Sequence, residues 1–173
     1  VYEKLDNTSK RLEKTYYVSQ LIKKTKSEDL SAIILLVQGK IYPESMENKI
    51  GISSKLVIKA INKSTGTSEK QIEETWKKLG DLGDVAKFLL EKKQQKSLFQ
   101  KELSVNDVLN NLRRLSEKQG MGSVDLKLSL ISDMLINSTS HEAKYIVRTV
   151  VDNLRIGLGR SSLRDAIIWA YFS

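Results

Sequence analysis

The chain has 173 residues, of which 40% are hydrophobic and 29% charged, and its formal net charge is +8 at pH 7. It is long enough for one sizeable core, but no apolar run approaches the roughly 20 residues that span a bilayer. It has no cysteine for a disulfide or thiolate metal site, and its single histidine, His141, cannot form a cluster.

The start of the chain has no basic and apolar secretion signal, so we expect a cytoplasmic protein. The excess of lysine and arginine suggests an anionic partner, because basic side chains that neutralise phosphates release condensed counterions. A lysine-rich solvated surface would give the same charge. The net charge therefore leaves both interpretations open, and the positions of the basic residues must decide between them.

The first half of the chain has apolar residues at close to the helical period. The apolar positions of two predicted helices are Leu30, Ile33, Ile34 and Val37 in one, and Leu56, Ile58, Ala60 and Ile61 in the other, which follows Ser53. Residues 41–50 contain the only proline and are predicted to form a long turn. The polar run 92–97 is predicted to lead from a helix end into an exposed connector.

The second half predicts four more helices. Ser104 and Ser123 are expected to be N-caps of the first two, and residues 139–142 have the pattern of a capping box. The apolar positions that follow the three caps are Val108, Leu112 and Leu115; Leu126, Leu128, Leu130, Ile131, Met134 and Leu135; and Tyr145, Ile146, Val150 and Leu154. The last helix carries Leu163, Ile167 and Ala170, and Trp76 and Trp169 are expected in the core.

These patterns predict an all-α fold, with one compact multi-helix domain over residues 1–173. Residues 53–83 and 123–159 share an order of capped helices and glycine turns. This similarity suggests an internal duplication, in which the domain consists of two pseudo-symmetric helical halves, 1–97 and 98–173.

Four glycine-containing turns, at 51–55, 80–83, 119–123 and 155–160, each precede a predicted helix. A helix N-terminus presents unpaired N–H groups and a positive dipole end, and a glycine lets a phosphate approach the backbone. Each glycine could instead be the C-cap of the preceding helix. Recurrence at four places favours anion binding, as do the nearby Lys55, Lys127, Arg155 and Arg160.

Arg148, Arg155 and Arg164 make the C-terminal region rich in arginine, which suits bidentate phosphate contacts. Ion pairs with Asp152 or Asp165 are the alternative. A search for known nucleotide-binding, zinc-protease and serine-hydrolase motifs finds none. We therefore predict neither a catalytic residue nor a metal site in this chain.

Several segments, in this order, resemble the N-terminal domain of archaeal and eukaryotic replicative ATP-dependent DNA ligases. They are residues 56–60 and 65–66, 80–83, 119–123, 144–148 and 154–158. The resemblance implies a helical domain that grips the minor groove on both sides of a nick through phosphate contacts. Such contacts position a protein on duplex DNA without reading bases. It also implies a role in DNA replication, repair and recombination.

The resemblance assigns DNA-binding roles to the matching turns. Backbone N–H donors are expected from Gly51, Gly80, Gly83, Gly120, Gly122 and Gly157, and side-chain contacts from Ser53, Ser123, Lys55, Lys127 and Arg155. Gln95, Leu98 and Phe99 resemble a motif that docks on a PCNA-type sliding clamp. The alternative is that Leu98 and Phe99 anchor the connector to the core.

One departure from the family is large. Ligation requires a Lys-x-Asp-Gly motif for adenylation, and the chain has no Asp-Gly dipeptide. It also starts at Val1 and stops where an adenylation domain would follow. We therefore expect an isolated domain that is not itself an enzyme and binds no cofactor, whereas ATP and magnesium belong to the full-length ligase. Its location would be cytoplasmic and nucleoid-associated, or nuclear in a eukaryote.

Two other functions remain as alternatives. A helical protein-interaction or scaffold domain could dock an acidic partner through its lysines. A complete small enzyme would need a site built from carboxylates and lysines that no motif marks. Salt dependence separates the first alternative from DNA binding, because binding to duplex DNA falls steeply as salt rises.

Overall fold

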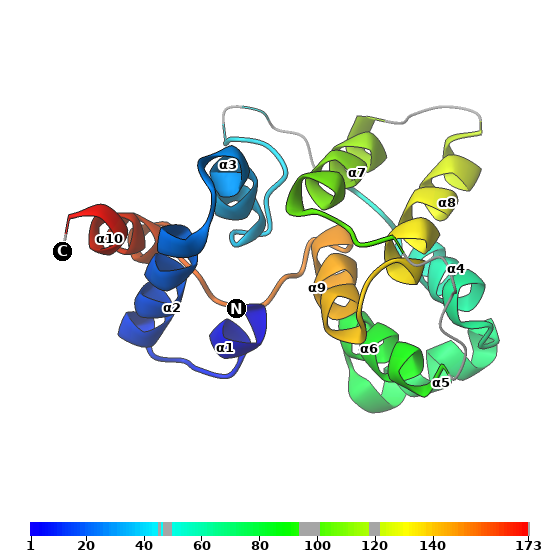
Figure 1. Cartoon of the computed structure of the whole chain (residues 1–173). Coiled ribbons are helices and arrows are strands. Elements are labelled where there is room, and N and C mark those ends of the chain that lie inside the picture. Colours follow the sequence, from blue (N-terminus) through cyan, green and yellow to red (C-terminus); the bar gives the residue numbers. More distant parts are fainter. Residues whose placement is uncertain (45, 47–49, 94–100, 118–121, 173) are drawn as a thin grey trace. The chain divides into compact units, whose positions relative to one another are not determined.

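The computed structural model describes residues 1–44, 46, 50–93, 101–117 and 122–172. The described residues form ten helices and no strand, which confirms the predicted all-α class (Figure 1). The helices are α1 (Tyr2–Asp6), α2 (Arg11–Lys24), α3 (Ser27–Leu36), α4 (Ser54–Thr65), α5 (Glu69–Leu79), α6 (Leu82–Lys92), α7 (Val105–Glu117), α8 (Ser123–Ile136), α9 (Ser140–Val150) and α10 (Arg160–Tyr171).

The chain divides into two compact units. Unit 1 comprises Val1–Ser45 and Leu154–Ser173, and unit 2 comprises Met46–Asn153. Unit 1 is therefore discontinuous in sequence, with unit 2 inserted between its two segments. This division differs from the halves 1–97 and 98–173 suggested by the sequence.

Unit 1 is built around α2, which packs against both α1 and α10. Val18 and Ile22 lie on the buried face of α2, and Leu163 and Ala166 on that of α10. This burial follows from the spacing of three or four residues, which places these side chains on one face of each helix. Tyr2 adds a long-range link, since its hydroxyl donates to the Leu36 carbonyl at 2.7 Å.

Unit 2 contains two closely packed helix pairs, α4 with α8 and α6 with α9, and α5 contacts both α4 and α6. Its core includes five fully buried residues, Val57, Ile61, Ile72, Leu112 and Ile131. The α4 stripe predicted from the sequence omitted Val57, which is fully buried. Leu56, which the stripe included, is only half-buried.

The helix that was predicted to include both Val150 and Leu154 is shorter than expected. α9 ends at Val150, because Asp152 takes a positive φ of 56° and the Asn153 N–H donates to the Arg148 carbonyl at 2.8 Å. Such backbone bonds satisfy the last carbonyls of a helix and turn the chain away. Leu154 is buried in unit 1, where it packs beside Gly39.

Most predicted caps are confirmed. The Ser53 hydroxyl caps α4, and Thr139 and Glu142 form the predicted capping box at α9. The prediction for Ser123 is wrong, because it is the first residue of α8 and Gly122 is the N-cap, with a φ of 80°. A glycine adopts that backbone conformation without strain, and it provides no side chain to bind the helix N–H groups.

Ser104 caps α7 and is linked to Asp107 in both directions. Its hydroxyl accepts from the Asp107 N–H at 3.0 Å, and its own N–H donates to the Asp107 carboxylate at 3.1 Å. The hydrogen bond from the Ser104 hydroxyl, followed by that from its N–H, lowers the pKa of Asp107. The charged carboxylate therefore stabilises the fold above its ordinary pKa, and this stabilisation is lost as pH falls through the lowered value.

Ser104→Ala should raise the pKa of Asp107 towards its ordinary value, because the hydroxyl bond to the carboxylate is lost. The measurement is an NMR titration of the Asp107 side chain in both proteins. Ser161→Ala, at an exposed position on α10, serves as the matched control and should leave the Asp107 titration unchanged. Equal Asp107 pKa values in wild type and Ser104→Ala would contradict the assignment.

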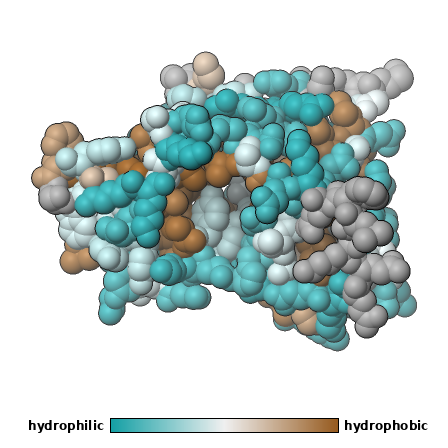
Figure 2. Space-filling view, in the orientation of Figure 1, coloured by the Kyte–Doolittle hydropathy of each residue, from teal (hydrophilic) through white to brown (hydrophobic). Residues whose placement is uncertain are grey.

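Neither tryptophan is a fully buried core residue. Trp169 is 37% exposed, and Trp76 is half-buried. Other large apolar side chains of unit 1 are also exposed, including Leu12 at 69% and Phe172 at 82%. Figure 2 shows brown hydrophobic groups of this kind among the mainly hydrophilic residues of the visible face.

Candidate nucleic-acid interface

The turn before α4 brings together three of the predicted site residues. Gly51 has a φ of 58°, and no heavy atom lies within 4 Å of the position that a Cβ would occupy. Ser53 caps the helix by accepting from the Leu56 N–H at 3.4 Å, and Lys55 is exposed in the first turn. The positive end of the helix dipole and an exposed ammonium group thus meet beside an open glycine backbone, which suits an anion.

The turn before α8 has a similar composition. Gly122 has a φ of 80°, no described heavy atom lies within 4 Å of the position that a Cβ would occupy, and Ser123 begins the helix. Lys127 is half-buried and lies four residues after Ser123, so both side chains occupy the same face of α8. Among the described residues no side chain caps α8, so its first N–H groups can hydrogen-bond an anion, although Asp125 stands in the same turn.

The structure separates the roles of Gly80 and Gly83. Gly80 is the C-cap of α5, with a φ of 74° and an N–H that donates to the Trp76 carbonyl at 2.7 Å. Gly83 is buried in the first turn of α6, where a Cβ would lie 2.5 Å from the Lys144 carbonyl oxygen. Gly80 therefore ends a helix, as the alternative interpretation held, and Gly83 allows α6 to pack closely on α9.

The same contact between α6 and α9 contains a buried ion-pair cluster. The Arg148 side chain donates to the Asp81 carboxylate at 3.1 Å and to that of Asp84 at 3.4 Å, and Lys144 lies 2.9 Å from Asp84. Arg148 and Asp81 are only 6% and 8% exposed. Arg148 is thus an ion-paired residue, although its partners differ from the Asp152 and Asp165 considered from the sequence.

In unit 1 the structure places Arg155 and Gly157 in the turn before α10. Both residues are exposed and have positive φ values, 56° for Arg155 and 60° for Gly157. Between them, the carbonyl of the buried Ile156 accepts a hydrogen bond from the Lys14 ammonium group. Lys14 was not among the residues predicted from the sequence. The signal for it is its position, since Lys14 continues the i+4 spacing of the apolar Val18 and Ile22 on α2.

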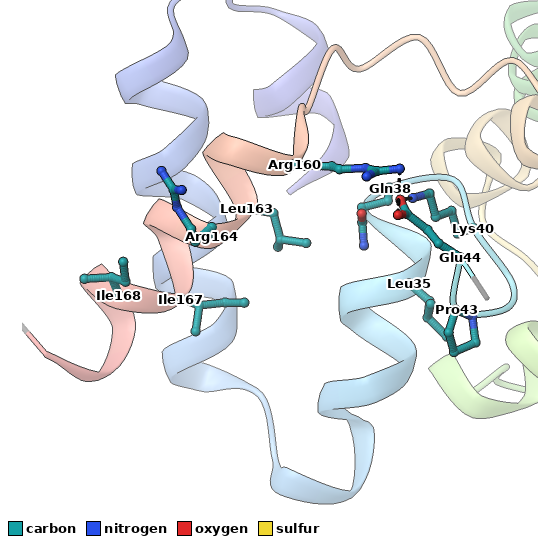
Figure 3. Close-up of a pocket in the computed structure, with 10 residues that line it drawn as sticks. All are labelled: Leu35, Gln38, Lys40, Pro43, Glu44, Arg160, Leu163, Arg164, Ile167 and Ile168. Carbon is teal, nitrogen blue, oxygen red and sulfur yellow. Dashed lines mark hydrogen bonds and ion pairs between the residues drawn. The ribbon is translucent and has the colours of Figure 1, made fainter.

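Two further arginines of α10 have carboxylate partners. Arg160 lies 2.6 Å from Glu44, which also pairs with Lys40, at the rim of a pocket of about 480 Å³ (Figure 3). Leu163 and Ile167 line this pocket, so much of its wall is apolar. Arg164 donates to Asp165 at 3.2 Å, and its hydrogen bond is the main reason that the pKa of Asp165 is lowered.

Some predicted residues lie outside the described part of the chain. These are Gly120 of the third turn and the clamp-motif residues Gln95, Leu98 and Phe99. Among the described residues, no group of three or more His, Asp or Glu side chains could hold a metal ion. In the same part of the chain, no helix has both the length and the apolar character needed to cross a membrane.

The fold and these turns define an all-helical domain in which glycine turns and basic side chains stand at helix starts. Residues 1–168 match the family described as DNA ligase N terminus. DNA ligases from Methanobrevibacter smithii, Thermococcus onnurineus and Nitrosopumilus maritimus are 39%, 37% and 36% identical to the chain over 99%, 99% and 98% of its length. The chain therefore belongs to the DNA ligase N-terminus family, which confirms the resemblance found in the sequence.

The match covers only part of these relatives. The chain spans 31%, 30% and 29% of the three ligases, or about three-tenths of their length. It corresponds to one module of such a protein.

Proposed function

We propose that this chain binds duplex DNA without regard to base sequence, around a nick, as the DNA-binding module of an ATP-dependent DNA ligase in replication, repair and recombination. Phosphates of the minor-groove edges would be held by the turns before α4, α8 and α10. The observation that carries this proposal is the exposure, at each of these helix starts, of a positive-φ glycine: Gly51, Gly122 and Gly157.

Three further features support DNA as the ligand. The basic residues Lys55, Lys127 and Arg155 lie near the three turns, and the net charge is +8. The relatives are named as DNA ligases. Contacts to phosphates through backbone N–H groups and basic side chains fix a protein's position on DNA but carry no sequence information directly. Gly83 is left out of the proposed interface because it is buried between two helices.

The proposal predicts that changing Lys55, Lys127 and Arg155 together to alanine weakens duplex binding. Each phosphate contact contributes about 0.9 to the slope of log affinity against log salt, so the slope should fall by up to about 2.7. The measurement is fluorescence anisotropy with nicked and intact duplexes of unrelated sequences, over a range of salt concentrations.

A second triple variant serves as the control for net charge. Lys24, Lys70 and Arg114 are exposed and lie outside the three turns, and changing them to alanine removes the same number of positive charges. This variant should keep nearly the wild-type slope. Equal losses in both triple variants would show that only the overall charge matters, and a wild type that does not bind at low salt would overturn the proposal.

For the full-length protein we propose DNA ligase activity, with ATP and magnesium bound outside this chain. A PCNA-type sliding clamp is a proposed partner through Gln95, Leu98 and Phe99. The proposed location is the cytoplasm, in association with the nucleoid, or the nucleus in a eukaryote. A clamp-binding measurement on the chain with Leu98 and Phe99 changed to alanine would test the partner.

A further inference from the structure

Lys14 is a buried cation in the structure of unit 1. It lies in the middle of α2, is only 8% exposed, and donates a hydrogen bond to the carbonyl of Ile156. A Cβ added to Gly157 would lie 2.8 Å from the Lys14 Nζ, so the ammonium group sits directly against the glycine backbone. Among the described residues no carboxylate forms an ion pair with Lys14.

Such burial is costly for a charge whose partner, in the part of the chain that the structure describes, is a carbonyl group. Buried ionised groups are normally paired with an opposite charge, since transfer from water removes their hydration. A carbonyl dipole satisfies one of the three ammonium hydrogens but neutralises no charge. The site therefore retains an excess positive charge behind the turn.

The turn in front of Lys14 has the features of an anion site. Arg155 and Gly157 are exposed and have positive φ values. The 12-residue helix α10 follows, with Gly159 as its N-cap, no capping side chain and no acidic residue in its first turn. Its first N–H groups thus have no capping side chain and no carboxylate in their own turn, and the Glu44 carboxylate nearby is paired with Arg160 and Lys40.

We propose that Lys14 is a positioning residue for a DNA phosphate held by the turn at Arg155–Gly159. Its ammonium group fixes the Ile156 carbonyl on the inner side of the turn. Because Gly157 has no side chain, the ammonium group lies close to the outer face of the turn, and its charge acts across the glycine backbone. The phosphate then supplies the counter-charge that no carboxylate among the described residues supplies. This inference rests on the proposed function, because it deepens the description of one of its turns.

Lys14→Met should leave the protein folded but weaken duplex binding. Methionine fills a similar volume without a charge, but the buried Ile156 carbonyl loses its hydrogen-bond donor, so the melting temperature should fall. A purely structural role for Lys14 would lower the melting temperature alone and leave binding by the folded protein unchanged. Duplex affinity should fall about tenfold at low salt. The slope of log affinity against log salt should fall by about 0.9, the share of one phosphate contact. Lys24→Met, on the exposed end of α2, is the matched control and should preserve both binding values.

A measurement on the wild type keeps the test independent of how the variant folds. The ¹⁵N resonance of the Lys14 ammonium group should shift when a short nicked duplex is added, while that of Lys24 stays in place. An unmoved Lys14 resonance in the DNA complex, or a folded Lys14→Met with wild-type affinity and salt slope, overturns the inference alone. Failure of the wild type to bind duplex overturns the proposed function, and this inference with it.

Discussion

Arg148→Ala should lower the free energy of unfolding by about 3–5 kcal/mol, because it removes one partner of a buried ion pair. Asp81 is 8% exposed and would keep its negative charge without the guanidinium group that donates to it at 3.1 Å. Lys144 lies 2.9 Å from Asp84 and can still neutralise that carboxylate. The expected loss therefore comes mainly from Asp81. Urea unfolding followed by far-UV circular dichroism measures it.

Arg164→Ala is the matched control for this prediction. Arg164 is exposed and pairs only with its neighbour Asp165 among the described contacts, so its removal should cost no more than about 1 kcal/mol. The double change Arg148→Met with Asp81→Asn removes both charges, keeps an acceptor for the Asp84 N–H that Asp81 caps at the start of α6, and should recover part of the stability. If Arg148→Ala costs no more than Arg164→Ala, the cluster does not hold α6 against α9.

Gly83→Ala should destabilise the chain by about 1–3 kcal/mol through overpacking. The added Cβ would lie 2.5 Å from the Lys144 carbonyl oxygen and 2.8 Å from the Arg148 Cγ, and the backbone carbonyl cannot move without shifting α9. Alanine is favoured over glycine in a helix by about 1 kcal/mol, so in open space the same change would be stabilising. The sign of the measured change therefore reports on the contact.

Gly159→Ala provides the comparison in a glycine with open surroundings. Its φ is −80°, and no heavy atom lies within 4 Å of its Cβ position. The cost should be no more than about 1 kcal/mol, from the poorer N-cap that alanine makes. Melting temperatures of both variants provide the measurement. A stabilised Gly83→Ala protein would refute the close packing.

The helices and most of their caps could be predicted because their signals are local. Ser53 and Thr139 each cap a helix through hydrogen bonds that span three residues. Val150 and Leu154 show the limit of this reasoning, because apolar spacing continues across a helix end that the backbone of Asp152 sets. Apolar periodicity alone does not mark such an end.

The roles of individual site residues were harder to predict than the helices. Gly83 and Gly51 both stand in a turn at the start of a predicted helix, so the sequence does not distinguish them. Gly83 is buried because α9 packs against it, whereas Gly51 is exposed. Arg148 contacts Asp81, which is 67 residues away in the sequence, and Lys14 contacts Ile156, which is 142 residues away. A single sequence does not reveal contacts between residues so far apart along the chain, because many different pairings of its polar residues are compatible with the same sequence.

The discontinuity of unit 1 has a consequence for the nascent chain. α2 can pack against α10 only after residues 46–153 have been synthesised. At about 5–20 residues per second, this synthesis takes on the order of ten seconds. During this interval the face of α2 that carries Val18 and Ile22 lacks the helix α10 that packs against it in the finished protein. Lys14 places a charge on that apolar face, and charged gatekeeper residues beside apolar segments oppose aggregation. We therefore expect this lysine, which is buried in the folded protein, to limit aggregation of the unfinished chain.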